Sequence, residues 1–210
     1  MSEAAVKLQP RHTWSDYRTW SDDQRWELIG GEAFLMAPSP TSRHQRVSME
    51  LTRQVANHFR GRSCTVLAAP MDVVLSEEDV VQPDVLVVCD ANKVKRTHIE
   101  GAPSLVVEIV SDSSVALDRR AKLNLYARAG VAEYWIVTPW PSLVEVLLLR
   151  GGKYEIAQVC GRDDELASPT FPELRIVLKE IFDFPLEPGE EPAVVREPPG
   201  PAYRAAGGQK

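Results

Sequence analysis

The pattern of apolar and polar positions divides residues 13–184 into many short strands and a few helices. Alternation and short apolar runs predict strands near residues 64–67, 71–75, 84–89, 105–110, 133–137, 143–149 and 154–159. Two apolar runs on either side of a Gly-Gly pair predict a tight β-hairpin over residues 26–36. A last strand and a short aromatic end are expected within residues 173–184.

Three helices are expected between and before these strands. The shortest runs from Thr13 to Trp20, and the longest covers about residues 43–60. At 100° per residue, the apolar side chains of the long helix fall on one side, and His44 shares their angle. His44 is therefore expected to point inward. The whole order predicts an α/β domain of the α+β, mixed-sheet type, with flanking helices and extra hairpins.

The third helix, about residues 116–129, ends at Gly130, which suits a helix C-terminus. Its apolar arc is set by four residues: Leu117, Ala121, Leu125 and Ala129. Lys122 and Asp118 fall inside or beside this arc. A lysine on the packing face of a helix is unusual, so Lys122 is a candidate for a role in chemistry.

Composition limits the other classes of protein. The chain has 210 residues, of which 44% are hydrophobic, enough for one sizeable core. Residues 1–12 are expected to form a flexible arm and the Pro- and Gly-rich residues 185–210 a disordered tail. We find neither a secretory signal nor an apolar run that could span a bilayer, so a cytoplasmic protein without membrane contact is expected. Cys64, Cys89 and Cys160 form no CxxC pair, and reduced, mostly buried thiols are predicted.

The strand at residues 104–110 carries a single charge, Glu108, among side chains that are apolar on both faces. A buried carboxylate must be protonated, paired or bound to a metal, because burying it alone costs several kcal/mol. Asp84 begins a second apolar strand, directly after Pro83. If the two strands pair antiparallel, Asp84 and Glu108 meet at one end of the sheet. Two close carboxylates commonly share a divalent cation.

Lys122 follows the Glu108 strand and is placed to reach this carboxylate pair. Its ammonium could orient a water and stabilise charge that develops in phosphoryl transfer. The alternative is an ion-pair network with a purely structural role. The residues by themselves give the two interpretations about equal weight, because perturbed charges occur in both.

Several segments, taken together, resemble one known family. They are WELIGGE (26–32), SPTSRHQR (39–46), VVQPDVLVV (80–88), IEGAPSLVVEIVSDSS (99–114), DRRAKLNLYARAGVAEYWIV (118–137) and VEVLLL (144–149). In this order they are similar to the Uma-type family of restriction endonucleases in the PD-(D/E)XK superfamily. The resemblance implies a restriction-endonuclease-like core over residues 13–184 and a metal-dependent endonuclease that hydrolyses DNA.

The resemblance also implies roles for single residues. Asp84 and Glu108 match the acidic positions and would bind Mg²⁺ or Mn²⁺. The superfamily pattern has a lysine two residues later, but Val110 stands there, and the family places this lysine at Lys122. Further positions match family motifs and are expected to support the site: His44 and Gln45 in the long helix, and Glu27 and Glu32 in the hairpin. One glutamate of the hairpin is expected to join the site, and the sequence leaves open which one.

Contacts with nucleic acid are harder to place. The formal net charge is -6, which disfavours a general DNA-coating protein but allows a locally basic surface. Two weak candidates are the arginine stripe of the long helix, with Arg46 and Arg53, and the loop at 91–104, with Lys95 and Arg96. A homodimer is expected, because two cuts in a duplex suit two-fold symmetry. The competing interpretation is a catalytically inactive protein that binds nucleic acid or a partner on the same fold.

Overall fold

A computed structural model describes residues 11–21, 24–36, 39–110 and 121–185. Its centre is a mixed six-stranded sheet with the order β11-β10-β9-β8-β6-β3. The strands are β3 (Thr65–Ala68), β6 (Val85–Val88), β8 (Leu105–Ile109), β9 (Glu133–Thr138), β10 (Leu143–Arg150) and β11 (Lys153–Gly161). Strands β8 and β9 are parallel, while β6 and β8 are antiparallel. All residues of β6 and β8 are buried, as their apolar faces predict.

Helix α2 (Ser42–Phe59) covers one face of this sheet. Its buried stripe of Val47, Leu51, Val55 and Phe59 packs with side chains of β6, β8 and β9. Helix α4 (Leu178–Ile181) and the small sheet of β12 (Glu165–Ala167) and β13 (Arg175–Val177) complete the same layer.

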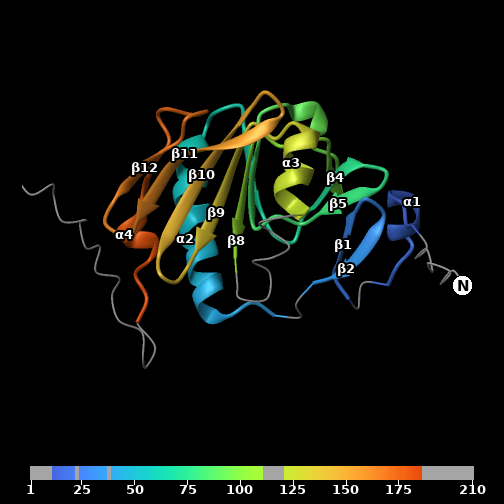
Figure 1. Cartoon of the computed structure of the whole chain (residues 1–210), viewed down its shortest axis with the longest axis horizontal. Coiled ribbons are helices and arrows are strands. Elements are labelled where there is room, and N and C mark those ends of the chain that lie inside the picture. Colours follow the sequence, from blue (N-terminus) through green and yellow to red (C-terminus); the bar gives the residue numbers. More distant parts are fainter. Residues whose placement is uncertain (1–10, 22–23, 37–38, 111–120, 186–210) are drawn as a thin grey trace, which may run out of the picture.

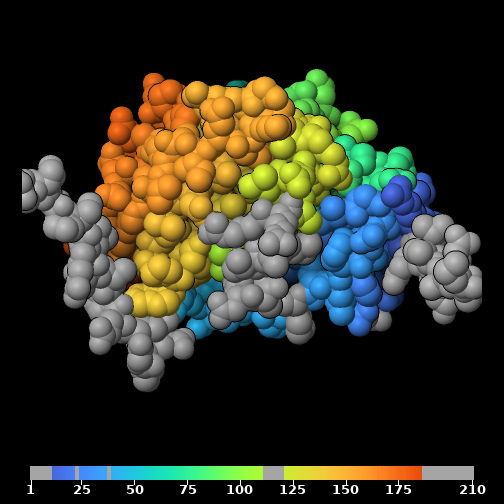
Figure 2. All heavy atoms as spheres, viewed as in Figure 1, coloured from blue at the N-terminus to red at the C-terminus, as the bar shows by residue number. Residues whose placement is uncertain are grey.

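Helix α3 (Leu123–Ala129) lies on the opposite face of the sheet, as Figure 1 shows. A second sheet of five strands, with the order β2-β1-β5-β4-β7, packs beside it in the same core. Its members are β1 (Trp26–Ile29), β2 (Glu32–Leu35), β4 (Asp72–Ser76), β5 (Asp79–Val81) and β7 (His98–Glu100). The short helix α1 (Trp14–Tyr17) covers the outer face of that sheet. In the space-filling view, the blue residues of β1 and β2 lie at one flank of the molecule and the orange-red residues of β12 and α4 at the other (Figure 2).

The local signals in the sequence explain most of these elements. Thr13 and Thr41 cap the N-termini of α1 and α2 with their side chains. Gly30 and Gly31 both have positive φ, which lets β1 turn tightly into β2. Gly130 ends α3 in the left-handed conformation. The predicted hairpin, the long helix and the seven predicted strands are therefore confirmed, with small shifts at their ends.

The pattern of apolar positions did not predict three short strands, β5, β7 and β12. The segment at 91–104, expected to be a loop, contains the 3₁₀ turn η1 (Ala91–Lys93) and β7, which pairs parallel with β4. Strands β5 and β12 have three residues each, too few for a visible period. Strand β5 pairs with β4 and β1, and β12 pairs with β13.

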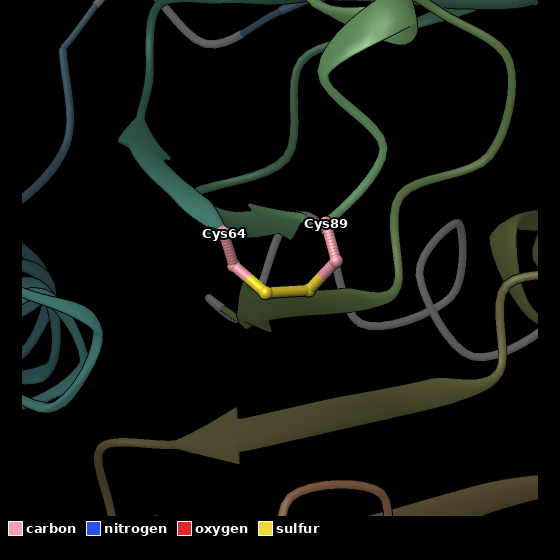
Figure 3. The surroundings of a disulfide bond; sticks show 2 residues. All are labelled: Cys64 and Cys89. Atoms are coloured by element: carbon pink, nitrogen blue, oxygen red, sulfur yellow. A yellow bond between two sulfur atoms is a disulfide. The ribbon is translucent and has the colours of Figure 1, made fainter. Parts of the chain in front are cut away.

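The cysteine prediction is wrong for two of the three residues. Cys64 and Cys89 form a disulfide at the end of the β3–β6 pair (Figure 3). Cys160 is a buried free thiol. The antiparallel register explains the juxtaposition, because Thr65 pairs with Val88 and the next pair outward is Cys64 and Cys89. Sequence spacing could not reveal this contact, since 25 positions separate the two cysteines.

Parts of the predicted organisation lie outside the described residues. These are most of the arm at 1–12, the tail from 186 to 210 and the beginning of the third helix with Asp118. Of the arm, Arg11 and His12 are described, and His12 donates its backbone N–H to Gly31 O at 2.8 Å. Within the described ranges, no helix has the length and apolar character needed to cross a membrane.

Candidate functional site

The pairing of β6 with β8 brings Asp84 beside Glu108. Val85 pairs with Val107 in this antiparallel pair, so Asp84, which precedes β6, lies opposite Glu108 of β8. The carboxylate of Asp84 accepts the backbone N–H of Ile109 at 2.7 Å, which fixes it at this end of the sheet. Glu108 is buried, with 4% of its surface exposed. The predicted antiparallel arrangement of the two acidic residues is thus present.

Lys122 reaches the same place from the start of α3. Its Nζ lies 3.0 Å from Glu108 Oε1 and 2.9 Å from Glu27 Oε1. All three side chains are at least 95% buried, so their attraction is weakly screened by water. The inward direction of Lys122, expected from helix geometry, is confirmed.

Glu27 is the glutamate of the hairpin that joins this cluster. It lies in β1 of the five-stranded sheet, and its Oε1 also accepts the backbone N–H of Gln82 at 2.9 Å. Glu32, in β2, is exposed to solvent. The choice that the sequence left open falls on Glu27, because only that side chain faces α3 and the six-stranded sheet.

Tyr126 belongs to the cluster and was missed by sequence reasoning. Its hydroxyl donates to Glu108 Oε1 at 2.6 Å, and the side chain is fully buried. Burial, followed by the negative charge of Glu108, raises the pKa of Tyr126 well above its usual value of 10.0. The sequence held a sign of this contact: Tyr126 follows Lys122 by four residues, the spacing that places two side chains on one side of a helix.

His44 approaches the acidic pair from the other side of the sheet, at the first turn of α2. Its Nε2 lies 3.3 Å from Asp84 Oδ2, and both side chains are largely buried. The inward orientation expected for His44 is therefore present. Gln45, its neighbour, is exposed. Asp84 thus contacts His44 and the β8 backbone, whereas Glu108 contacts Lys122 and Tyr126.

The basic residues expected to contact nucleic acid bond to groups outside this cluster. Arg46 donates to the carbonyl of Asp183, and Arg53 forms ion pairs with Glu50 and Glu180. Lys95 pairs with Glu100 at 3.0 Å. Arg96 is exposed in the loop before β7. Much of the charge of Arg53 and Lys95 is locally balanced, which weakens both as phosphate contacts.

The donor set at the end of β6 and β8 fits a hard divalent cation with few protein ligands. Among residues 11–21, 24–36, 39–110 and 121–185, no three His, Cys, Asp or Glu side chains are grouped to hold a metal. Mg²⁺ is commonly held by one or two carboxylates and keeps several waters. Asp84 and Glu108 supply such a pair. This arrangement suits Mg²⁺ or Mn²⁺ better than zinc, which prefers a closed set of nitrogen and sulfur ligands.

Comparisons with known proteins agree with this fold. Residues 14–179, well over half of the chain, match the model of the Uma2 family, described as "Putative restriction endonuclease". An uncharacterized protein from Synechocystis is 29% identical over 140 residues, which cover 65% of this chain and 71% of that protein. A crystal structure from Anabaena variabilis, titled as a putative nuclease of DUF820, aligns with a TM-score of 0.66 at 18% identity. The alignment covers 81% of this chain and 97% of that one, and so shows a shared fold.

Proposed function

The chain belongs to the Uma2 family of restriction-endonuclease-like proteins, and from this premise we propose that it is a metal-dependent endonuclease acting on DNA. The reaction is hydrolysis of a phosphodiester bond. One observation carries the proposal: the β6–β8 register places Asp84 beside Glu108, with the ammonium of Lys122 3.0 Å from the Glu108 carboxylate. Two acidic side chains and one lysine at a sheet end are the groups that this chemistry needs.

Each residue has a distinct part in the proposed mechanism. Asp84 and Glu108 would hold Mg²⁺ or Mn²⁺, which when bound neutralises phosphate charge and lowers the pKa of a coordinated water. Lys122 would orient the attacking water and stabilise the negative charge that develops on the phosphate oxygens. The N–H of Ile109 holds Asp84 in place, and Tyr126 holds Glu108, so neither carboxylate has to be ordered during the reaction.

A second function is favoured by a different observation. Lys122 lies between two buried carboxylates, Glu27 and Glu108, which is the pattern of a structural ion-pair network. With a formal net charge of -6, this pattern would suit an inactive protein that binds nucleic acid or a partner. The nuclease is the stronger proposal, because pairing of Lys122 with Glu27 and Glu108 does not account for a further carboxylate, Asp84, beside Glu108.

Cleavage of plasmid, single-stranded and branched DNA with Mg²⁺ or Mn²⁺ tests the proposal. The variants are Asp84→Asn and Lys122→Met, each of which removes one charge. Their controls are Asp183→Asn and Lys153→Met, which change exposed residues of the same kinds. We expect metal-dependent cleavage by the wild type and both controls, and a loss of at least about a hundredfold in the two site variants.

Two results would contradict the proposal. Metal-dependent cleavage that survives Asp84→Asn and Lys122→Met would remove these residues from the mechanism. Absence of cleavage on every substrate, together with no heat of Mg²⁺ or Mn²⁺ binding by calorimetry, would favour the inactive binding protein.

The assembly is part of the same proposal. We propose a two-fold homodimer, because two symmetry-related sites can each cut one strand of a duplex. Light scattering on the purified full chain, with and without DNA, measures this directly. A monomer under both conditions would limit the proposal to one cut per binding event.

A further inference from the structure

We call Asp84, Glu108, Glu27 and Lys122 the acidic cluster. An aromatic corner lies outside it, where α1 covers the five-stranded sheet. We define it by His12, Tyr17, Trp20 and Trp26. The ring centroids of Trp20 and Trp26 are 5.8 Å apart, with an angle of 74° between the ring planes. The His12 ring meets Trp20 edge-on, with a centroid distance of 5.1 Å. The ring centroid of Tyr17 lies 5.5 Å from that of Trp20. Four rings so close, and none of them fully buried, offer flat apolar surface to a ligand.

Two hollows adjoin this corner and share Trp20, Ser21 and Trp26 as walls. The larger, of about 400 Å³, is completed by His12 and Ala33. The smaller, of about 140 Å³, is polar. Its remaining walls are Tyr17, Gln24, Arg25, Asp72 and Gln82. A volume of about 400 Å³ falls within the range of small-ligand sites.

The polar wall is rigidly built. Gln82 accepts from Arg25 Nε at 2.8 Å and donates to Asp72 at 2.9 Å and to the hydroxyl of Tyr17 at 3.1 Å. The Tyr17 hydroxyl in turn donates to Asp72 at 2.9 Å. These bonds hold the amide, the carboxylate and the guanidinium at fixed positions beside the aromatic rings.

The corner and the acidic cluster lie at the same end of the five-stranded sheet. Trp26 directly precedes Glu27, and Gln82 directly precedes Pro83 and Asp84. The backbone N–H of Gln82 donates to the Glu27 oxygen that Lys122 also contacts. The two sites therefore adjoin through the β1–β5 pair, with the acidic cluster on the inner face of the sheet and the aromatic corner on the outer one.

We propose that the aromatic corner binds an unpaired nucleobase of a DNA strand whose backbone passes the Asp84–Glu108 pair. This inference rests on the proposed nuclease function and deepens it, because it assigns a substrate with single-stranded character. Every base has a face that stacks on tryptophan, so the site would tolerate any sequence. The wall also carries the guanidinium of Arg25, bonded to Gln82, the hydroxyl of Ser21 and the carboxylate of Asp72, which can bond to the polar edge of a base.

Binding of a short, labelled oligothymidylate to the full chain tests this proposal. The Asp84→Asn substitution is present throughout, so that the strand is not cut. Trp20→Leu removes the aromatic face and keeps an apolar side chain, while Trp20→Phe keeps a ring. Trp14→Leu is the matched control, because Trp14 packs on the same face of the five-stranded sheet as Trp20 but lines neither hollow. Circular dichroism and melting curves show whether each variant folds.

Fluorescence anisotropy should give a dissociation constant that Trp20→Leu raises about tenfold or more. Trp20→Phe should recover most of this loss, and Trp14→Leu should leave affinity unchanged. An oligomer whose central bases are removed should bind the parent protein as weakly as the intact oligomer binds Trp20→Leu. Equal affinity for the intact and the abasic oligomer, or for all variants, would overturn the proposal.

The outcome is separable from that of the cleavage test. DNA cleavage by the wild type, combined with unchanged binding in Trp20→Leu, would overturn the aromatic site and leave the nuclease standing. Base-dependent binding that is lost in Trp20→Leu, without cleavage of any substrate, would support the site and contradict the nuclease.

Discussion

Lys122 places its ammonium 2.9 Å from the carboxylate of Glu27, although the two residues belong to different parts of the fold. Glu27 lies in the five-stranded sheet, and Lys122 directly precedes the helix that covers the six-stranded one. The same ammonium contacts Glu108. One ammonium thus contacts two buried carboxylates and joins the two sheets at the candidate site.

The first prediction concerns the stability of this arrangement. Lys122→Met removes the ammonium that contacts both buried carboxylates, Glu27 and Glu108, which should lower the free energy of unfolding by about 3–5 kcal/mol. Urea denaturation measures the loss. Adding Glu27→Gln to Lys122→Met removes one uncompensated charge, so the double variant should be more stable than Lys122→Met by itself.

Lys153→Met serves as the control, because Lys153 is exposed at the start of β11 and should change stability by less than about 0.5 kcal/mol. If Lys122→Met unfolds at the same urea concentration as Lys153→Met, the buried triad does not exist in solution as described.

Sequence reasoning located the acidic pair for a physical reason that is visible in one strand. Glu108 is a lone charge in an apolar segment, and such a charge needs a partner. Helix angles gave the inward direction of Lys122 and His44, because a helix fixes side-chain directions locally. Tyr126 lies on the same helix face but resembles an ordinary core residue, since tyrosine carries no charge that demands an explanation.

Long-range pairing could not be obtained in this way. Glu27 was distinguished from Glu32 only by the packing of β1 against α3, which depends on contacts between distant segments. The disulfide between Cys64 and Cys89 depends on the register of β3 and β6. Register is set by the whole sheet, so neither contact leaves a local mark in the chain.

The second prediction concerns alkaline pH and Tyr126. Burial raises the pKa of this phenol in the folded state, while the unfolded chain titrates near 10.0. Below pH 10 the phenol is protonated in the folded and the unfolded state, so its contribution to the free energy of unfolding is fully present. Above it the unfolded state ionises first, so stability falls as pH rises towards the folded-state pKa.

Tyr126→Phe removes both the titration and the hydrogen bond to Glu108. At neutral pH it should cost about 1.5–3 kcal/mol, because a bond to a charged acceptor is lost. Above pH 10, stability of the variant should fall less steeply than that of the wild type. Urea curves at a series of pH values test this, and parallel pH profiles would show that Tyr126 does not titrate differently in the two states.

The third prediction concerns the cysteines. Protein unfolded without reductant should show one reactive thiol, from Cys160, and three after reduction. Replacing Cys64 and Cys89 together by serine frees a loop of 25 positions and should cost about 3–4 kcal/mol through the entropy of the unfolded chain. Cys160→Ser, with the disulfide intact, separates this effect from loss of a buried thiol. Three thiols before reduction would contradict the disulfide.

The last prediction concerns Glu133, a fully buried carboxylate at the start of β9. It accepts three hydrogen bonds: from Trp135 Nε1 at 2.6 Å, from the hydroxyl of Ser168 at 2.9 Å and from the backbone N–H of Thr170 at 2.8 Å. Through them Glu133 holds the segment after β12 against the central sheet.

Glu133→Ala leaves these three donors buried without an acceptor. Each orphaned donor costs about 1–3 kcal/mol, so the variant should lose at least about 3 kcal/mol of stability. Glu155→Ala, an exposed change on β11, should stay within about 0.5 kcal/mol of the wild type. Because Glu133 lies at the opposite end of the β8–β9 pair from Glu108, any folded Glu133→Ala protein should keep the metal dependence of cleavage. An altered metal dependence would show that the two ends of the sheet are coupled.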